Sequence, residues 1–151
     1  MMQVIRTNSN NKDFQELVKN LDIELHLRYA DEQLFYDQFN KIDAIKYVVI
    51  VYDQDKSVGC GAIKEYAEKT MEVKRMYVQL ANRGKGIASM VLQELEKWAI
   101  ELGYEKCVLE TGKKQPEAIR LYEKNNFYLI PNYGQYELVE SSVCFEKELR
   151  R

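Results

Sequence analysis

Two glycines, Gly84 and Gly86, separate a strand-like segment from a helix-like segment. Residues 70–78 contain β-branched and aromatic residues that favour a strand, and the apolar residues of 87–102 lie on one helical stripe. A turn without Cβ atoms lets a ligand approach the backbone closely. At a helix start, free N–H groups and the positive end of the helix dipole favour a phosphate. This order of strand, turn and helix therefore predicts a phosphate site at the turn.

The remainder of the chain predicts one mixed α/β domain over residues 1–151, because the length suits one core and no linker or repeat interrupts it. Segments rich in β-branched and aromatic residues predict strands at residues 4–5, 45–52, 57–66, 70–78, 107–109, 127–130 and 143–148. Apolar residues at helical spacing predict four helices, which run to Leu25, around residues 34–39, over 87–102 and from Pro116 to Tyr122. The first should begin after an N-cap at Asn10 or Asn11, and Gly103 should end the third.

The composition argues against several classes of partner. Lys and Arg number 22 against 24 Asp and Glu, so no global basic field is expected to hold nucleic acid or an anionic membrane. No run approaches the roughly 18–20 apolar residues that span a bilayer, and the N-terminus lacks the pattern of a signal peptide. Cys60, Cys107 and Cys144 lie in strand-like contexts, which are typical of buried free thiols. We therefore expect a cytoplasmic protein without disulfides or a metal site.

Other phosphate motifs and other chemistries fit the chain less well. A P-loop needs a hydroxyl residue where Gly86 stands. The dinucleotide fingerprint tolerates Ser89 at its third small position and Glu110 as its ribose-binding acid, but it belongs to the first strand–helix unit. The glycine turn instead follows a series of predicted strands in mid-chain. His26 is the only histidine, so neither a Ser-His-Asp triad nor a histidine-based zinc site is expected.

Residues 72–78, 83–88, 109–112 and 115–127 agree in order and spacing with the motifs of one family. They resemble the GNAT superfamily of acetyl-CoA-dependent N-acetyltransferases, and the likeness covers roughly residues 57 to 149. The resemblance implies a GNAT-like α/β fold with a mixed, mostly antiparallel central sheet of about six to seven strands, flanked by about four helices.

The glycine turn carries the most specific part of this likeness. Arg83, Gly86 and Ala88 match the family's Arg/Gln-x-x-Gly-x-Gly/Ala pattern. Asn126 stands where the family usually has glycine, and asparagine tolerates the left-handed conformation better than most residues. The departure at Asn126 is therefore mild.

The resemblance implies that acetyl-CoA is the acetyl donor and that an amine attacks its thioester directly through a tetrahedral intermediate. The backbone of the turn would hold the cofactor's pyrophosphate, at Arg83, Gly84, Lys85, Gly86, Ile87, Ala88 and Ser89. The pantetheine would pair along a strand edge, which can also supply an oxyanion N–H, at Met76, Tyr77 and Val78. Gln115 stands where many relatives carry an asparagine that contacts the cofactor.

Two side chains match the family's catalytic positions. An amine with a pKa of about 10.4 is almost entirely protonated at neutral pH, and Glu72 matches the strand glutamate that acts as base. The alternative for Glu72 is an exposed strand carboxylate facing Lys74, and Glu65 is the reserve candidate for the base. Tyr122 matches the helix tyrosine that protonates the leaving thiolate. Its alternative is a core aromatic one turn after Ala118.

The family's example assigns acceptor choice to the first helices and the last strand–loop, here residues 22–39 and 131–136. Tyr133 and Tyr136, with Asn132, would either line a pocket or form a turn packed over the sheet edge. We expect the acceptor to be a primary amine of a small molecule or peptide, and the resemblance is compatible with a homodimer. The alternative function is a non-catalytic acyl-CoA-binding sensor, and the presence of both catalytic candidates favours the enzyme.

Overall fold

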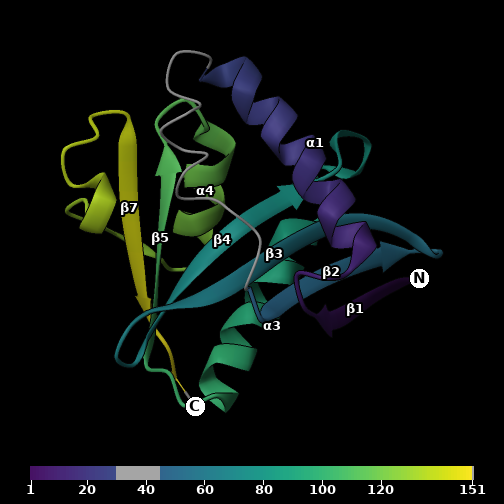
Figure 1. The fold of residues 1–151 in the computed structure, drawn as a ribbon, viewed down its shortest axis with the longest axis horizontal. Coiled ribbons are helices and arrows are strands. Elements are labelled where there is room, and N and C mark those ends of the chain that lie inside the picture. The colour runs from purple at the N-terminus through teal and green to yellow at the C-terminus, as the bar shows by residue number, and fades with distance from the viewer. Residues whose placement is uncertain (30–44, 151) are drawn as a thin grey trace. The chain divides into compact units, whose positions relative to one another are not determined.

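The computed structural model describes residues 1–29 and 45–150 (Figure 1). The strands are β1 (Met2–Thr7), β2 (Tyr47–Asp53), β3 (Lys56–Ala67), β4 (Thr70–Val78), β5 (Lys106–Gly112), β6 (Tyr128–Ile130) and β7 (Ser142–Glu148). The α-helices are α1 (Lys12–Arg28), α3 (Ile87–Glu101) and α4 (Pro116–Lys124), and the 3₁₀ helices are η1 (Leu80–Asn82) and η2 (Gly134–Tyr136). The helix expected around residues 34–39 lies outside the described residues.

Hydrogen bonds join the strands into a seven-stranded sheet in the order β1-β2-β3-β4-β5-β7-β6. The β4–β5 pair is parallel, whereas β1–β2, β2–β3, β5–β7 and β6–β7 are antiparallel. The predicted mixed, mostly antiparallel α/β sheet is therefore confirmed. No helix within residues 1–29 and 45–150 is long and apolar enough to cross a membrane.

Contacts divide the chain into two compact units. The first unit comprises Met1–Lys64 and Lys74–Leu95, and the second comprises Glu65–Val73 and Glu96–Arg151. Strands β3 and β4 and helix α3 each contribute residues to both units. A single domain over residues 1–151 stays a prediction.

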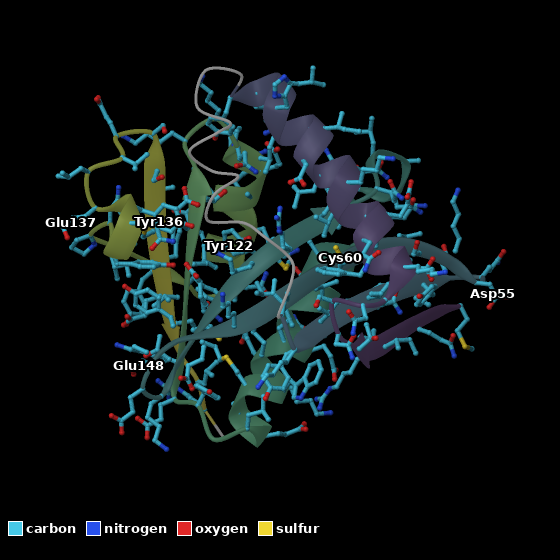
Figure 2. The ribbon with its side chains drawn as sticks, viewed as in Figure 1. Asp55, Cys60, Tyr122, Tyr136, Glu137 and Glu148 are labelled. Carbon is cyan, nitrogen blue, oxygen red and sulfur yellow. The ribbon has the colours of Figure 1, made fainter. Side chains whose placement is uncertain are left out.

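In the first unit, helix α1 packs on one face of the β2–β3 hairpin. The N-cap of α1 is Asn11, one of the two positions predicted for it. The Asn11 side chain accepts a hydrogen bond from the Phe14 N–H at 3.0 Å. The buried side of α1 meets alternate residues of the two strands, which share one face because Val48 pairs with Ala62 and Ile50 with Cys60. This cluster contains Phe14, Leu17, Val18, Ile45, Val48, Ile50, Cys60 and Ala62, of which Cys60 is labelled in Figure 2.

Helix α3 packs on the opposite face of the same hairpin. Val49 pairs with Gly61 and Val51 with Gly59, so these glycines lie on the face turned away from α1. A Cβ on Gly59 would lie 2.7 Å from Ile87 at the start of α3, and one on Gly61 would lie 2.7 Å from Val91. Both distances are too short, so the two glycines allow α3 to lie close against β3. This packing fixes where α3 begins and therefore where the glycine turn lies.

In the second unit, β5 is hydrogen-bonded to the first residues of β4 on one side and to β7 on the other. The β4–β5 ladder ends at Glu72 and Val108, although β4 continues to Val78 and β5 to Gly112. Helix α4 is followed by Asn126, whose φ of 71° is left-handed, as predicted for this position. The turn at Asn126 lets the Phe127 N–H donate to the Tyr122 carbonyl at 3.0 Å.

The three cysteines are buried free thiols in strand interiors, as predicted. Cys60 lies in β3, Cys107 in β5 and Cys144 in β7. Burial raises the pKa of the Cys60 thiol to about 12 and that of the Cys107 thiol to about 12. These thiols therefore behave as small apolar side chains at neutral pH.

Candidate functional site

The glycine turn at the start of α3 has an open, left-handed backbone. Gly84 has a φ of 81° and Gly86 a φ of 79°, values that other L-residues rarely adopt. Apart from chain neighbours, no described atom lies within 4 Å of a Cβ built on either glycine. The Met90 N–H donates to the Gly86 carbonyl at 3.1 Å, so the helical ladder begins at Gly86. The first N–H groups of a helix have no intrahelical acceptor, so this turn can receive an anion.

The side chains of the turn differ in what they do. Ile87 is 1% exposed and packs against Gly59, so its side chain anchors the turn to the sheet. Lys85 is exposed. The Arg83 guanidinium donates from Nε to the Val78 carbonyl at 3.0 Å and from Nη2 to Glu24 of α1 at 2.6 Å. Arg83 therefore ties the turn to β4 and α1, and protein groups already engage its side chain.

The second half of β4 contains the predicted strand edge. The Met76 side chain packs over Gly61, since its sulfur lies 2.5 Å from a Cβ built there. Tyr77 packs against the α1-facing cluster, and the Arg83 guanidinium lies 5.5 Å from its ring centroid. Burial, and next the Glu24 carboxylate, raise the pKa of Tyr77. The Val78 side chain lies 3.4 Å from a Cβ built on Gly59, and its backbone carbonyl accepts from Arg83. The side chains of this segment therefore serve packing.

Arg75, within β4, has a left-handed backbone that no sequence pattern predicted. Its φ of 60° costs free energy for a residue with a Cβ. The surrounding contacts maintain it: the guanidinium side chain is 6% exposed and pairs with Asp22 at 2.9 Å, and the backbone carbonyl accepts from Cys60 Sγ at 3.4 Å. An arginine within a strand carries no local signal for this conformation, so only tertiary contacts reveal it.

In the second unit, Glu72 is a buried carboxylate on β4. It is 7% exposed, and its Oε2 accepts a hydrogen bond from the Tyr133 hydroxyl at 2.5 Å. The alternative of an exposed strand carboxylate is therefore wrong, because the β4–β5 ladder carries Glu72 into the interior of this unit. Glu65, the reserve base, is exposed and accepts a hydrogen bond from the Tyr104 hydroxyl. Burial thus distinguishes the two candidate bases.

Tyr133 belongs to a cluster of three tyrosine rings. Its ring meets Tyr66 edge-on at 4.9 Å between centroids and Tyr136 at 5.8 Å. Burial, and next the Glu72 carboxylate, raise the pKa of Tyr133, so its hydroxyl stays protonated and donates. Tyr136, labelled in Figure 2, is 2% exposed, and the Asn132 amide donates to backbone carbonyls of residues 139 and 142. Tyr136 and Asn132 therefore form a packed turn, whereas Tyr133 reaches the candidate base.

Tyr122 lies on the buried face of α4 (Figure 2). It is 5% exposed and packs against Phe127 and Phe145, with ring centroids 5.8 and 6.1 Å away. Its ring is thus a core aromatic, as the alternative predicted, while an acid role for its hydroxyl stays a prediction. Burial, and next the Glu110 carboxylate, raise the pKa of Tyr122 above its ordinary value. Glu110 is itself held by the Ser142 hydroxyl at 2.6 Å.

Gln115 joins the end of β5 to the start of α4. Its side-chain oxygen accepts from the Gly112 N–H at 3.3 Å and from the Thr111 hydroxyl at 3.4 Å. These bonds order the connection, and a contact with the cofactor stays a prediction. Among the residues described here, no group of three His, Cys, Asp or Glu side chains is arranged to hold a metal ion.

Comparison with known sequences identifies one matching family. The model of the acetyltransferase (GNAT) family matches residues 11–127, which include the glycine turn, Glu72 and Tyr122. The uncharacterized N-acetyltransferase YsnE of Bacillus subtilis is 34% identical over 100 residues, which are 65% of this chain and 66% of the relative. The chain therefore spans just under two thirds of that relative's length.

Solved structures share the fold. A Klebsiella pneumoniae protein provisionally assigned as an acyl-CoA N-acyltransferase has a TM-score of 0.83 at 24% identity, over 99% of both chains. The PaiA N-acetyltransferase of Thermoplasma acidophilum, solved in complex with coenzyme A, has a TM-score of 0.72 at 17% identity, over 98% of this chain and 99% of that one. At these identities the likeness concerns the fold alone.

Proposed function

Because the chain belongs to the acetyltransferase (GNAT) family, we propose that it is an N-acetyltransferase, which transfers the acetyl group of acetyl-CoA to a primary amine of a small molecule or peptide. The observation that carries this proposal is the open, left-handed glycine turn at the start of α3, inside the family's matched range. When bound, acetyl-CoA supplies an activated acetyl thioester. The residues of the chain supply binding, orientation and proton transfer.

The backbone from Arg83 to Ser89 is the proposed pyrophosphate site, since the turn is open and its helix start favours an anion. Lys85 is the side chain we expect to add positive charge, because Arg83 is engaged by Glu24. The backbone of Met76, Tyr77 and Val78 is the proposed edge for pantetheine. Support comes from the ladder between β4 and β5, which ends at Glu72, before these residues. Gln115 is a further residue that we propose contacts the cofactor.

Glu72 is the proposed general base and Tyr122 the proposed general acid. The carboxylate of Glu72 takes the proton from the amine nitrogen as that nitrogen bonds to the acetyl carbon. The carbon–sulfur bond breaks, and the Tyr122 hydroxyl gives its proton to the leaving sulfur. The raised pKa of Tyr122 keeps this hydroxyl protonated at neutral pH, as an acid requires.

The buried free thiols support the cytoplasmic location that we also propose.

The deciding experiment measures free thiol release from acetyl-CoA by the purified protein across a panel of primary amines. We expect release that depends on the amine, with the acetylated amine detected by mass spectrometry. Reactions without amine provide the background. Failure of the protein to bind acetyl-CoA would overturn the proposal. Binding without release across the panel would instead favour the non-catalytic sensor.

A further inference from the structure

We infer that Tyr133 is a positioning residue that orients the Glu72 carboxylate for proton transfer; this rests on the proposed role of Glu72 as general base. Tyr133 comes from the segment before η2, far from β4 in the sequence, and the family's example places it in the loop for acceptor choice, with no role toward the base. Its hydroxyl nevertheless donates to Glu72 Oε2 at 2.5 Å.

The hydrogen bond from Tyr133 acts on the terminal torsion of the Glu72 side chain. The last torsion of a glutamate is broad and roughly two-fold, so the backbone of β4 alone does not fix the plane of the Glu72 carboxylate. A hydroxyl bonded to a carboxylate at 2.5–2.7 Å makes a strong, charge-assisted contact. Because Tyr133 holds Oε2, it restricts the plane of the carboxylate and therefore the directions in which the other oxygen of Glu72 can point.

The tyrosine that donates is itself held in place. Its ring is bracketed edge-on by Tyr66 at 4.9 Å and by Tyr136 at 5.8 Å. Gly134, the next residue, has a left-handed φ of 52°, and a Cβ there would lie 3.0 Å from the Tyr66 hydroxyl. The glycine thus lets the loop bring Tyr133 against Tyr66. A donor fixed in this way orients the base without an ordering cost at each turnover.

Two other tyrosine–carboxylate pairs within the described part of the chain differ from this one in burial. Tyr128 donates to Glu146 at 2.6 Å, and Tyr52 donates to Asp13 at 2.6 Å, but both bonds are exposed to solvent. Exposed pairs contribute little, whereas a pair in a low-dielectric interior is stronger. The exposed Tyr128–Glu146 pair therefore provides a control with the same chemistry as the Tyr133–Glu72 pair.

The first test detects the hydrogen bond without any catalysis. Proton NMR should show a downfield hydroxyl resonance that is lost in both Tyr133→Phe and Glu72→Gln and retained in Tyr128→Phe. A resonance that persists in Tyr133→Phe, or its absence from the unchanged protein, would overturn the inference. This measurement stands whether or not an acceptor amine has been found, so it is separate from the test of the proposed function.

The second test asks whether the bond serves Glu72. Tyr133→Phe should lower kcat about 10- to 100-fold, the range for a hydrogen bond to a charged group, with the KM for acetyl-CoA unchanged. Tyr128→Phe should behave like the unchanged protein. A wild-type kcat in Tyr133→Phe, or a loss confined to the KM for acetyl-CoA, would contradict the inference.

A double-mutant cycle separates positioning from a general loss of structure. Glu72→Gln alone should lower kcat by about 10²- to 10⁴-fold, and adding Tyr133→Phe should lower it no further. Independent, additive losses would mean that Tyr133 acts on something other than Glu72. An active Glu72→Gln variant would remove Glu72 as base and so overturn both claims about this pair, while acetyl-CoA binding and transfer would remain.

A second variant tests the bracket around Tyr133. Tyr66→Ala removes the ring that packs on Tyr133 but leaves the Tyr133 hydroxyl in place. Because Tyr66 is 41% exposed, the fold should tolerate the change. We expect kcat to fall as in Tyr133→Phe, but by a smaller factor. If both single variants, Tyr66→Ala and Tyr133→Phe, showed wild-type kinetics, the positioning role would be refuted.

Discussion

The glycine turn of the first unit and the Glu72–Tyr133 pair of the second are built in opposite ways. The turn is made from consecutive residues, and its function rests on backbone conformation at Gly84 and Gly86. The pair joins side chains 61 residues apart through one hydrogen bond. Added bulk should therefore damage the turn, whereas loss of a single polar atom should damage the pair.

The largest effect should come from filling the turn. Gly86→Trp should abolish the rise in Tm that acetyl-CoA produces, because an indole would occupy the open space at the proposed pyrophosphate site. At a ligand concentration of about 100 times Kd, the stabilisation lost is about 2.7 kcal/mol. Differential scanning fluorimetry with and without acetyl-CoA measures it.

The chain offers a matched control at the other end of α3. Gly103 also has a left-handed φ, of 90°, and open space around a built Cβ. Gly103→Trp should therefore carry a similar backbone cost, about 1–2 kcal/mol, and keep the acetyl-CoA-induced shift. A shift that survives Gly86→Trp, or one lost equally in both variants, would show that the pyrophosphate site is misplaced.

An intermediate effect is expected from removing one oxygen in the second unit. Tyr122→Phe should lower kcat about 100-fold, since general acids typically contribute 10²–10⁴-fold, and should leave acetyl-CoA affinity intact because the ring and its packing remain. Because the pKa of Tyr122 is raised, the unchanged enzyme should show no loss of kcat from this group up to about pH 10. Steady-state kinetics against pH checks both points; unchanged turnover would remove Tyr122 from the acid role.

The smallest expected effect is a pH dependence of the free energy of unfolding that comes from two buried thiols, one in each unit. The pKa of Cys60 and that of Cys107 are raised from 9.0 to about 12, so above pH 9 unfolding releases their protons. The unfolded state then binds fewer protons than the native state, and stability falls as pH rises from about 9 to 12, by about 1.4 kcal/mol per pH unit for each thiol.

Urea unfolding at pH 8 and pH 10 measures this loss. Cys60→Ala and Cys107→Ala should each reduce the difference in stability between the two pH values by a similar amount. A pH dependence that neither substitution alters would assign the loss to the buried tyrosines. An effect of only one substitution would mean that the two units do not share one unfolding transition.

Much of the fold could be predicted from local patterns. Within the described residues, strand and helix positions agree with the structure to within a few residues. The largest differences are at the ends of α1 and β5, which continue to Arg28 and Gly112, three residues beyond the predicted ends. Polar strand ends such as Glu110 and Thr111 lack the apolar pattern that marks a strand, and only pairing with β7 identifies them. Asn11 as N-cap and Asn126 as a left-handed residue follow from side-chain chemistry within a few residues of chain.

The candidate site was only partly predictable. The family pattern pointed to Glu72 and Tyr122, but not to the burial of Glu72 or the partner it finds in Tyr133. The sequence also assigned Tyr133 to a possible acceptor pocket together with Tyr136 and Asn132, whereas the structure separates their roles. The engagement of Arg83 by Glu24 likewise required α1 to be placed beside the turn.

By itself, the sequence determined the order of strand, glycine turn and helix, and the family to which the chain belongs. These features depend on φ preferences, capping and periodicity, which act between near neighbours in the chain. Only the tertiary structure decided which carboxylate is buried, which tyrosine bonds to it and which groups engage Arg83. Those outcomes depend on strand register and on packing between distant segments, where a shift of one residue would turn Glu72 to the other face of its sheet.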